Sequence, residues 1–194
     1  MKKIFLLIFV LFFLTGCFNF KSISSSKDSL KSKSWLELYS TGSFKIAIPA
    51  AWDKLNSNNN IIPKPIYWKI VLVALSKNQN LGFYNNLVIL SQDLNNKKIT
   101  SSEYSILNNN LSKSSYLEYK LLKEKDIVFP NGKKSKLFVF KARYNDKSPK
   151  AVFIQSAQVC DDTWYLLTIW LNQMVENTEK YEKIIETFDC TNVQ

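Results

Sequence analysis

The side chains that the chain lacks limit the chemistry open to it. Its 194 residues include no histidine, which excludes Ser-His-Asp and Cys-His catalytic arrangements, histidine-ligated zinc and histidine general bases. Only four glycines are present, and none belongs to a glycine-rich phosphate-binding loop. The most reactive side chains that remain are those of Cys17, Cys160 and Cys190. The sequence therefore contains no set of residues that defines a reaction.

Two residue pairs have spacings that catalytic groups use. Ser24 and Lys27 have the Ser-x-x-Lys spacing of a serine–lysine nucleophile, but the accompanying Lys-Thr-Gly motif is missing and a Ser-rich segment does not hold a reactive geometry. Asp161 and Asp162 could bind a cation or act as a general acid and base, but adjacent aspartates between two strands are typical of a turn. We predict no catalytic residue, no metal site and no cofactor.

Cys17 closes an apolar N-terminal segment. Lys2 and Lys3 precede eleven consecutive Ile, Leu, Phe and Val residues at 4–14. A transmembrane helix needs roughly 20 apolar residues, whereas this run has the length and basic start of a secretory signal. The sequence "LTGC" at 14–17 resembles the lipobox of bacterial lipoproteins, in which the cysteine thiol receives diacylglycerol and becomes the first mature residue. The alternative, an uncleaved anchor or a buried helix, lacks the polar residues at helical spacing that a core helix shows.

This resemblance divides the chain into three parts. We expect residues 1–16 to be a signal peptide, residues 17–34 to be the lipidated cysteine with a tether rich in Ser and Lys, and residues 35–194 to be one globular domain. A flexible chain with the 17 residues of 18–34 has an end-to-end distance of roughly 20–25 Å. The predicted protein is a monomer held to the membrane by lipid and exposed outside the cytoplasm, in a periplasm or on the outer cell surface.

The basic charge of the chain does not predict nucleic-acid binding. Its formal net charge of +10 falls to +8 without Lys2 and Lys3, and lysine supplies 25 of the 26 basic residues. Arg143 stands alone, and neither an arginine-rich stripe nor a base-stacking motif is present. We interpret most lysines as solvated surface. Those of the tether would each add up to about 1 kcal/mol of attraction to an anionic leaflet: Lys21, Lys27, Lys31 and Lys33.

Apolar patterning predicts a sheet and two helices. Residues 44–48 alternate before Pro49, and 68–76 and 86–92 are apolar on both faces, as are strands covered on both sides. Thr100 and Glu103 have the capping-box spacing that begins a helix. In this first predicted helix the apolar residues at helical spacing are Tyr104, Leu107 and Leu111. A second helix is predicted after Asn177, where helical spacing is shown by Tyr181, Ile184, Ile185 and Phe188.

Two hairpins separate these helices. Pro130-Asn131-Gly132 lies between strand-like runs, and Asn-Gly supplies the positive backbone angles of a tight turn. Asp161-Asp162 lies between the runs 151–160 and 163–171. Adjacent hairpins without βαβ repeats predict an α+β domain, a mostly antiparallel β-sheet covered by helices.

A series of segments over about residues 42–189 follows the order known from one protein superfamily. They are "FKIAIPAAW", the two-strand block, the first helix, the Asn-Gly hairpin, "WYLLTIW" and "YEKIIETF". Together they resemble the PsbP-like superfamily, which includes extrinsic photosystem II subunits, a Ran-binding nuclear-transport branch and many bacterial lipoproteins. Family-like positions are held by Phe44, Pro49, Trp52, Gly132, Tyr165 and Phe188, while Ala51 replaces a frequent Gly. The resemblance implies an α/β/α sandwich that binds partners without catalysis. No segment matches a photosystem-binding or Ran-binding surface.

Cys160 and Cys190 can form one disulfide if Cys17 carries lipid. Cys160 ends one strand, the next strand runs away from it, and the last helix runs back toward it before Cys190. A helix rises less per residue than a strand, so this return is long enough only if the helix crosses obliquely. Two free thiols are the alternative.

The five tryptophans suggest sugar binding or core packing. Trp164 and Trp170 share one strand face, as core residues do, and Trp52 is expected to plug the end of the sheet, whereas Trp35 and Trp68 lie near loops and the tether. The segment 53–68 combines polar residues and prolines with apolar groups, so it is either a candidate partner-binding loop or a loop that folds back over the sheet. Its candidate residues are Ile61, Ile62, Tyr67 and Trp68.

These features predict a lipid-anchored accessory protein without catalytic activity, whose partner is a protein of the cell envelope. Two alternatives stay open: an envelope hydrolase that uses carboxylates, and a carrier of small ligands or lipid. A hydrolase of this kind would show a pocket lined by Asp or Glu with raised pKa values.

Overall fold

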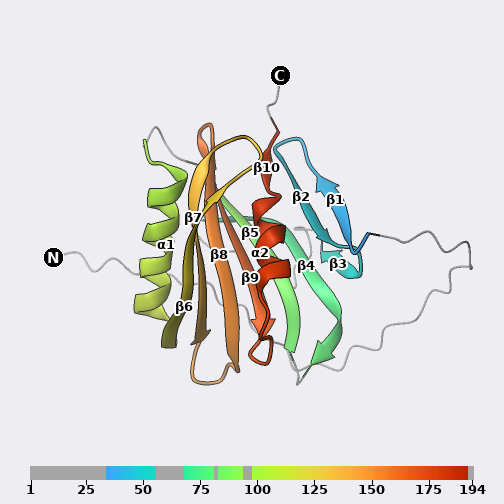
Figure 1. Cartoon of the computed structure of the whole chain (residues 1–194), viewed down its shortest axis with the longest axis vertical. Helices are drawn as coiled ribbons and strands as arrows, with labels where there is room; N and C mark the ends of the chain where they lie inside the picture. The colour runs from blue at the N-terminus through green and yellow to red at the C-terminus, as the bar shows by residue number, and fades with distance from the viewer. Residues whose placement is uncertain (1–33, 56–67, 81–82, 94–97, 192–194) are drawn as a thin grey trace, which may run out of the picture.

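The computed structural model describes residues 34–55, 68–80, 83–93 and 98–191, and the account below concerns these residues. They form two antiparallel sheets and two helices (Figure 1). The elements follow one another as β1 (Leu36–Ser40), β2 (Phe44–Pro49), β3 (Trp52–Leu55), β4 (Lys69–Asn80), β5 (Phe83–Asp93), α1 (Ser101–Ser115), β6 (Leu117–Val128), β7 (Lys134–Arg143), β8 (Lys150–Cys160), β9 (Thr163–Asn172), α2 (Glu179–Glu186) and β10 (Asp189–Cys190).

The larger sheet has the order β3-β4-β5-β9-β8-β7-β6, and all its pairs are antiparallel. Both predicted hairpins are confirmed. In the β6–β7 turn, Gly132 has φ 80°, and its N–H donates to the carbonyl of Phe129 at 2.8 Å. Between β8 and β9 the chain turns at Asp161, which has φ 49°. The segments predicted as covered strands, β4 and β5, lie inside the sheet.

The main core fills the space between the larger sheet, the smaller sheet and α2. On β9 the alternate residues Tyr165, Leu167, Ile169 and Leu171 face this core. They meet Ile184 and Ile185 of α2, which are both fully buried. Burial of each such side chain contributes about 1.5–3 kcal/mol, so the apolar stripe predicted for the last helix holds α2 on the sheet.

The smaller sheet, with the order β1-β2-β10, changes the predicted architecture. The sequence predicted a sheet covered by helices, an α/β/α sandwich. In the structure one face of the larger sheet is covered partly by the smaller sheet and by the eight-residue α2 (Figure 1). The fold is therefore mostly antiparallel β with two helices. The helical cover was overestimated because only β2 of these three strands has a periodic signal, and nothing in that signal shows that it forms a separate sheet.

Helix α1 lies on the opposite face, over β7 and β8, and begins as predicted. The Thr100 side chain accepts from the Glu103 N–H, and the Glu103 carboxylate accepts from the Thr100 N–H at 2.8 Å, which completes a capping box. Trp164 and Trp170 share this side of the sheet, as expected. Tyr104 lies with Trp164 in one apolar cluster, and Trp170 belongs to a second.

The inward face of α1 differs from the prediction. Tyr104 is buried, but Leu107 and Leu111 are 45% and 37% exposed. Serine and asparagine take their place against the sheet. The Ser105 hydroxyl donates to the carbonyl of Lys136 at 2.6 Å, and this hydrogen bond attaches α1 to β7. Residues with the same inward position are Ser101, Asn108, Asn109 and Ser112.

Within the described residues, neither helix combines the length and the apolar composition that crossing a bilayer requires.

Candidate functional site

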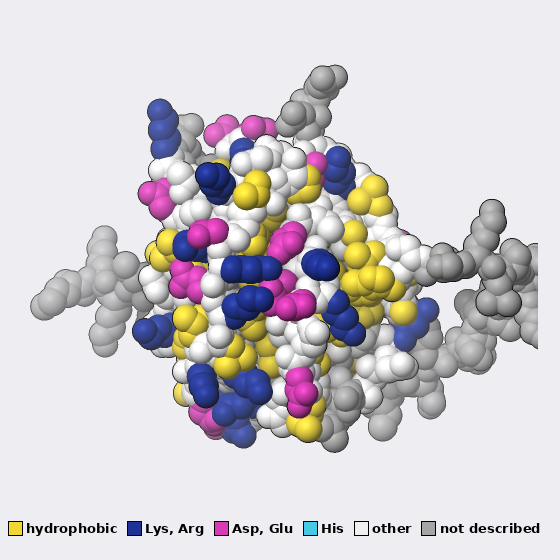
Figure 2. Space-filling model, in the orientation of Figure 1, with side chains coloured by type: hydrophobic (Ala, Val, Ile, Leu, Met, Phe, Trp, Pro, Cys, Tyr) yellow, Lys and Arg dark blue, Asp and Glu magenta, His cyan; other side chains and the backbone are white. Residues whose placement is uncertain are grey.

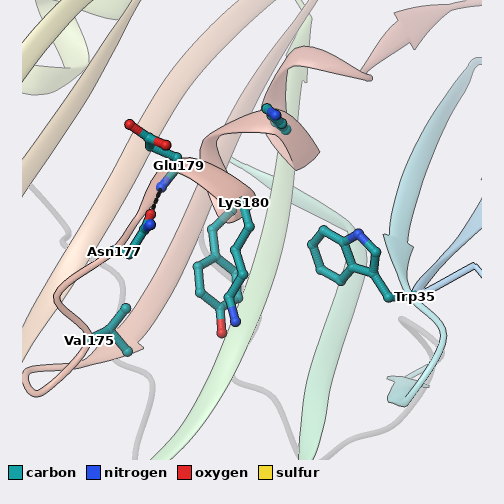
Figure 3. A pocket seen from close by; sticks show the side chains of 7 residues that line it. Trp35, Val175, Asn177, Glu179 and Lys180 are labelled. Carbon is teal, nitrogen blue, oxygen red and sulfur yellow. Dashed lines mark hydrogen bonds between the residues drawn. The ribbon is translucent and has the colours of Figure 1, made fainter.

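An open groove of about 530 Å³ lies between the start of β1 and the N-terminal half of α2 (Figure 3). Trp35 forms one wall. Lys180, Tyr181 and Lys183 of α2 form the other, and Val175 lines the groove from the loop that precedes the helix. The groove thus combines aromatic, apolar and cationic groups on a rigid part of the fold.

The amphipathic pattern of α2 determines which side chains reach the groove. Ile184 and Ile185 are buried in the core, so Lys180 and Lys183 lie on the exposed surface of the helix. Asn177 fixes the entry to the helix, because its Oδ1 accepts from the Glu179 N–H at 2.9 Å (Figure 3). This wall is therefore held in place before any ligand arrives.

Two aromatic rings supply the apolar surface of the groove. Trp35 is 47% exposed, and its carbonyl accepts from the Ala50 N–H at 2.9 Å, which fixes the backbone at the start of β1. The Tyr181 ring stacks on Trp52, with 6.3 Å between ring centroids. The Lys180 ammonium lies 4.9 Å from the centroid of the Tyr181 ring, a cation–π contact of about 0.5–1 kcal/mol.

A cluster of charges lies on the other side of α2, where Glu182 is buried. Its carboxylate accepts from Lys123 and Lys125 of β6 at 2.9 and 2.8 Å, and from the Thr178 hydroxyl at 2.7 Å. Lys125 also contacts Glu186 at 2.6 Å. Figure 2 shows these alternating charges at the centre of the visible face. The cluster joins the edge strand β6 to α2.

The pKa of Glu182 reports this arrangement. Burial raises it, but the hydrogen bonds from Lys125, Thr178 and Lys123 outweigh burial and hold the pKa below its ordinary value. Glu103 and Glu118 also have lowered pKa values, because of hydrogen bonds from Thr100 and Lys150 respectively. All the carboxyl pKa shifts resolved in the described chain are therefore downward, whereas a general acid needs an upward shift.

Of the two residue pairs with catalytic spacings, Asp161 and Asp162 lie among the described residues, and Ser24 and Lys27 lie outside them. Asp161 and Asp162 are exposed residues of the β8–β9 turn, which confirms their interpretation as turn formers. No cluster of three or more potential metal ligands occurs among the described residues. Tyrosine pKa values are shifted too: burial raises that of Tyr144 to about 12, so this phenol stays neutral.

Cys160 and Cys190 form a disulfide, with 5.8 Å between their Cα atoms. It joins the end of β8 to β10. The return of the chain along α2 is thus long enough to bring the two cysteines together. Cys17, the predicted lipidation site, lies outside the described residues.

Of the predicted partner-binding loop, Ile61, Ile62 and Tyr67 also lie outside the described residues. Trp68 is partly buried, and its ring centroid is 6.1 Å from that of Tyr104. Trp68 thus packs in the apolar cluster on the α1 side of the sheet, as a core residue does. Its part in partner binding stays a prediction.

The structure brings Trp35, which the sequence suggested as a ligand residue, next to residues that the sequence did not suggest. Lys180, Tyr181 and Lys183 were predicted as parts of an amphipathic helix, and nothing in their spacing links them to Trp35. The available signal was weak: an aromatic residue at the end of the tether, and two lysines on the polar face of the last helix.

No protein-family model matches the chain, and no curated protein matches its sequence. Solved structures do share its fold. The solution structure of cyanobacterial PsbP (CyanoP) from Synechocystis sp. PCC 6803 is 9% identical and covers 86% of this chain and 98% of its own, with a TM-score of 0.54. The crystal structure of the Ran-binding protein Mog1p from Saccharomyces cerevisiae is 9% identical and covers 79% of this chain and 94% of its own, with a TM-score of 0.51.

These similarities place the domain in a structural class. It is an α+β protein built mainly of antiparallel strands, and its fold is PsbP-like. The PsbP-like fold that the sequence predicted is thus confirmed.

Proposed function

We propose that this protein is a lipid-anchored envelope protein that acts by binding a partner and not by catalysis. In this proposal residues 1–16 are removed, Cys17 carries diacylglycerol, and the PsbP-like domain is held outside the cytoplasm as a monomer. The motif "LTGC", which begins at the last of eleven apolar residues, is the basis of the anchor.

The groove beside α2 is the observation that carries the binding role. It presents the exposed ring of Trp35 and two lysines on a preformed surface, as binding sites do. Hydrogen bonds hold the pKa values of Glu103, Glu118 and Glu182 below the ordinary value, which makes these carboxylates poor proton donors. The loop residues Ile61, Ile62, Tyr67 and Trp68 supply a second candidate contact for a protein partner.

Mass spectrometry and metabolic labelling test the anchor. Cells that express the chain are grown with labelled palmitate, and the protein is recovered from the detergent phase. We expect label on the wild-type chain, an N-terminus at Cys17, and neither label nor membrane retention for Cys17→Ser. An intact Met1 terminus with an unmodified Cys17 would refute the anchor.

Crosslinking in intact membranes tests the partner. We expect the wild-type chain to capture a specific envelope protein. A variant with Ile61→Ser, Ile62→Ser and Tyr67→Ala should lose that capture. Leu107→Ser, which changes an exposed apolar residue of α1, is the matched control and should keep it. Failure of the wild-type chain to capture any specific protein would remove the partner-binding role.

A further inference from the structure

The groove lies where the tether enters the domain. Trp35 follows Ser34 directly, and residues 18–34 separate it from Cys17. With the lipid anchor of the proposed function, on which this inference rests, Trp35 is the groove residue nearest to the bilayer along the chain. The length of roughly 20–25 Å predicted for this segment from its sequence would let this side of the domain touch the lipid headgroups.

An exposed aromatic side chain lies at the same entry point. Trp35 is 47% exposed and comes directly before β1, an edge strand of the smaller sheet. Figure 2 shows apolar side chains over the β1–β2 region. Tryptophan suits the boundary between lipid and water because it joins a large apolar ring to a polar N–H group.

The charges of α2 are divided between its two sides. Toward β6, Glu182 and Glu186 are neutralised by Lys123 and Lys125. Toward the groove, Lys180 and Lys183 are exposed, and no ion pair joins either to a carboxylate in the described part of the chain. Glu179 is the acidic residue of the groove, so its lining keeps one excess positive charge.

The tether adds charge of the same sign. Residues 18–34 contain four lysines and one aspartate. A surface that joins interfacial apolar groups to cations, and that follows a basic tether, is complementary to an anionic bilayer. A soluble glycan could also stack on the aromatic ring. Binding of a soluble glycan, however, does not explain why the groove lies beside the tether.

We propose that the domain lies on an anionic phospholipid surface with this face. Trp35 enters the interfacial layer, and Lys180 and Lys183 contact lipid phosphates. The domain then has one preferred orientation relative to the bilayer.

Quenching by brominated lipid tests the orientation. The lipidated protein is reconstituted in vesicles of phosphatidylglycerol and phosphatidylcholine with dibrominated acyl chains, and tryptophan emission is measured. We expect Trp35→Phe to remove most of the quenched emission. Trp68→Phe, which removes a ring packed against Tyr104, is the matched control and should leave the quenched emission unchanged.

Vesicle flotation tests the charges without the lipid anchor. The unlipidated chain, residues 17–194 with Cys17→Ser, is mixed with the same vesicles. Loss of Lys180 and Lys183, each changed to Gln, should weaken binding roughly tenfold or more. The control changes Lys113 and Lys120 to Gln, which removes the same charge from α1 and β6, and should weaken binding much less.

This orientation would be overturned if Trp35→Phe and Trp68→Phe removed equal amounts of the quenched emission. It would also be overturned if the two pairs of lysine substitutions weakened vesicle binding equally. If the lipidated chain still floats with vesicles in that case, the anchor stands and only the orientation is wrong. If the chain from cells lacks lipid, the anchor is wrong, while the flotation of the unlipidated chain still tests the groove.

Discussion

Cys160 and Cys190 connect the two sheets of the domain through one covalent bond. Cys160 is the last residue of β8 in the seven-stranded sheet, and Cys190 is the last residue of β10 in the three-stranded sheet. Between them the chain forms β9 and α2. The disulfide therefore closes the smaller sheet over the main core, at the end where Phe44 and Phe188 stack with 5.2 Å between ring centroids.

Removal of this disulfide should destabilise the domain markedly. The two cysteines are 30 residues apart, and a closed loop of that length contributes about 3–4 kcal/mol in the chain-entropy model. We expect the double change Cys160→Ala and Cys190→Ala to lower the free energy of unfolding by that amount in denaturant titrations. A reducing agent should destabilise the wild-type chain similarly and leave the variant unchanged. A loss below about 1 kcal/mol would contradict the pairing.

The buried carboxylate of Glu182 should make stability depend on pH. Its pKa is lowered in the folded state from an ordinary value of 4.5. The stabilisation is therefore fully present above that value and is lost as the pH falls through the lowered pKa. Glu182→Gln should cost about 1–3 kcal/mol at pH 7, because it removes hydrogen bonds to charged lysines.

Urea titrations between pH 7 and pH 3 measure this effect. The difference between the wild-type chain and Glu182→Gln should be constant near pH 7 and shrink in acid. Glu186→Gln is the control: Glu186 is 34% exposed and shares only Lys125, so its loss should cost about 1 kcal/mol or less. A difference that grows toward acid would show that Glu182 is not held ionised.

The polar attachment of α1 leads to an unusual ranking of two helix substitutions. Ser105 is fully buried and donates to the Lys136 carbonyl, whereas Leu107 is 45% exposed. Ser105→Ala should cost about 1 kcal/mol. Leu107→Ala should change stability by about 0.5 kcal/mol or less. Thermal unfolding of both variants tests this order, and a larger loss for Leu107→Ala would support the apolar inward face predicted from the sequence.

Much of the larger sheet could be predicted from the sequence, because long strands and hairpins have strong local signals. The strands β4 and β5 are long apolar runs, and Gly132 supplies the positive φ that the β6–β7 turn needs. Short strands have no such signal. With five residues in β1 and two in β10, no pattern distinguishes these strands from loops, so β2 was predicted but the smaller sheet was not.

The candidate site was harder to predict for a different reason. Trp35 could be suggested because it is aromatic and follows a polar tether. Lys180 and Lys183 reach it only because Ile184 and Ile185 fix the rotation of α2 on the core. The buried face of α1 was predicted wrongly because the prediction used only the spacing of apolar residues. Such spacing does not show hydrogen bonds to the sheet such as the one from Ser105.

The turn residue Asp161 should respond to substitution according to its backbone angle alone. It has φ 49°, a conformation that costs an L-residue about 1–2 kcal/mol and glycine almost nothing. Asp161→Gly should therefore leave stability unchanged or raise it. Asp161→Val should lower stability by about 1 kcal/mol or more, because a β-branched side chain disfavours this angle. Asp162→Ala is the control, since Asp162 is not among the described residues with positive φ. Chemical denaturation of the three variants ranks them. If the loss of either carboxylate were to destabilise the chain regardless of the replacement, Asp161 and Asp162 would have a role beyond the turn.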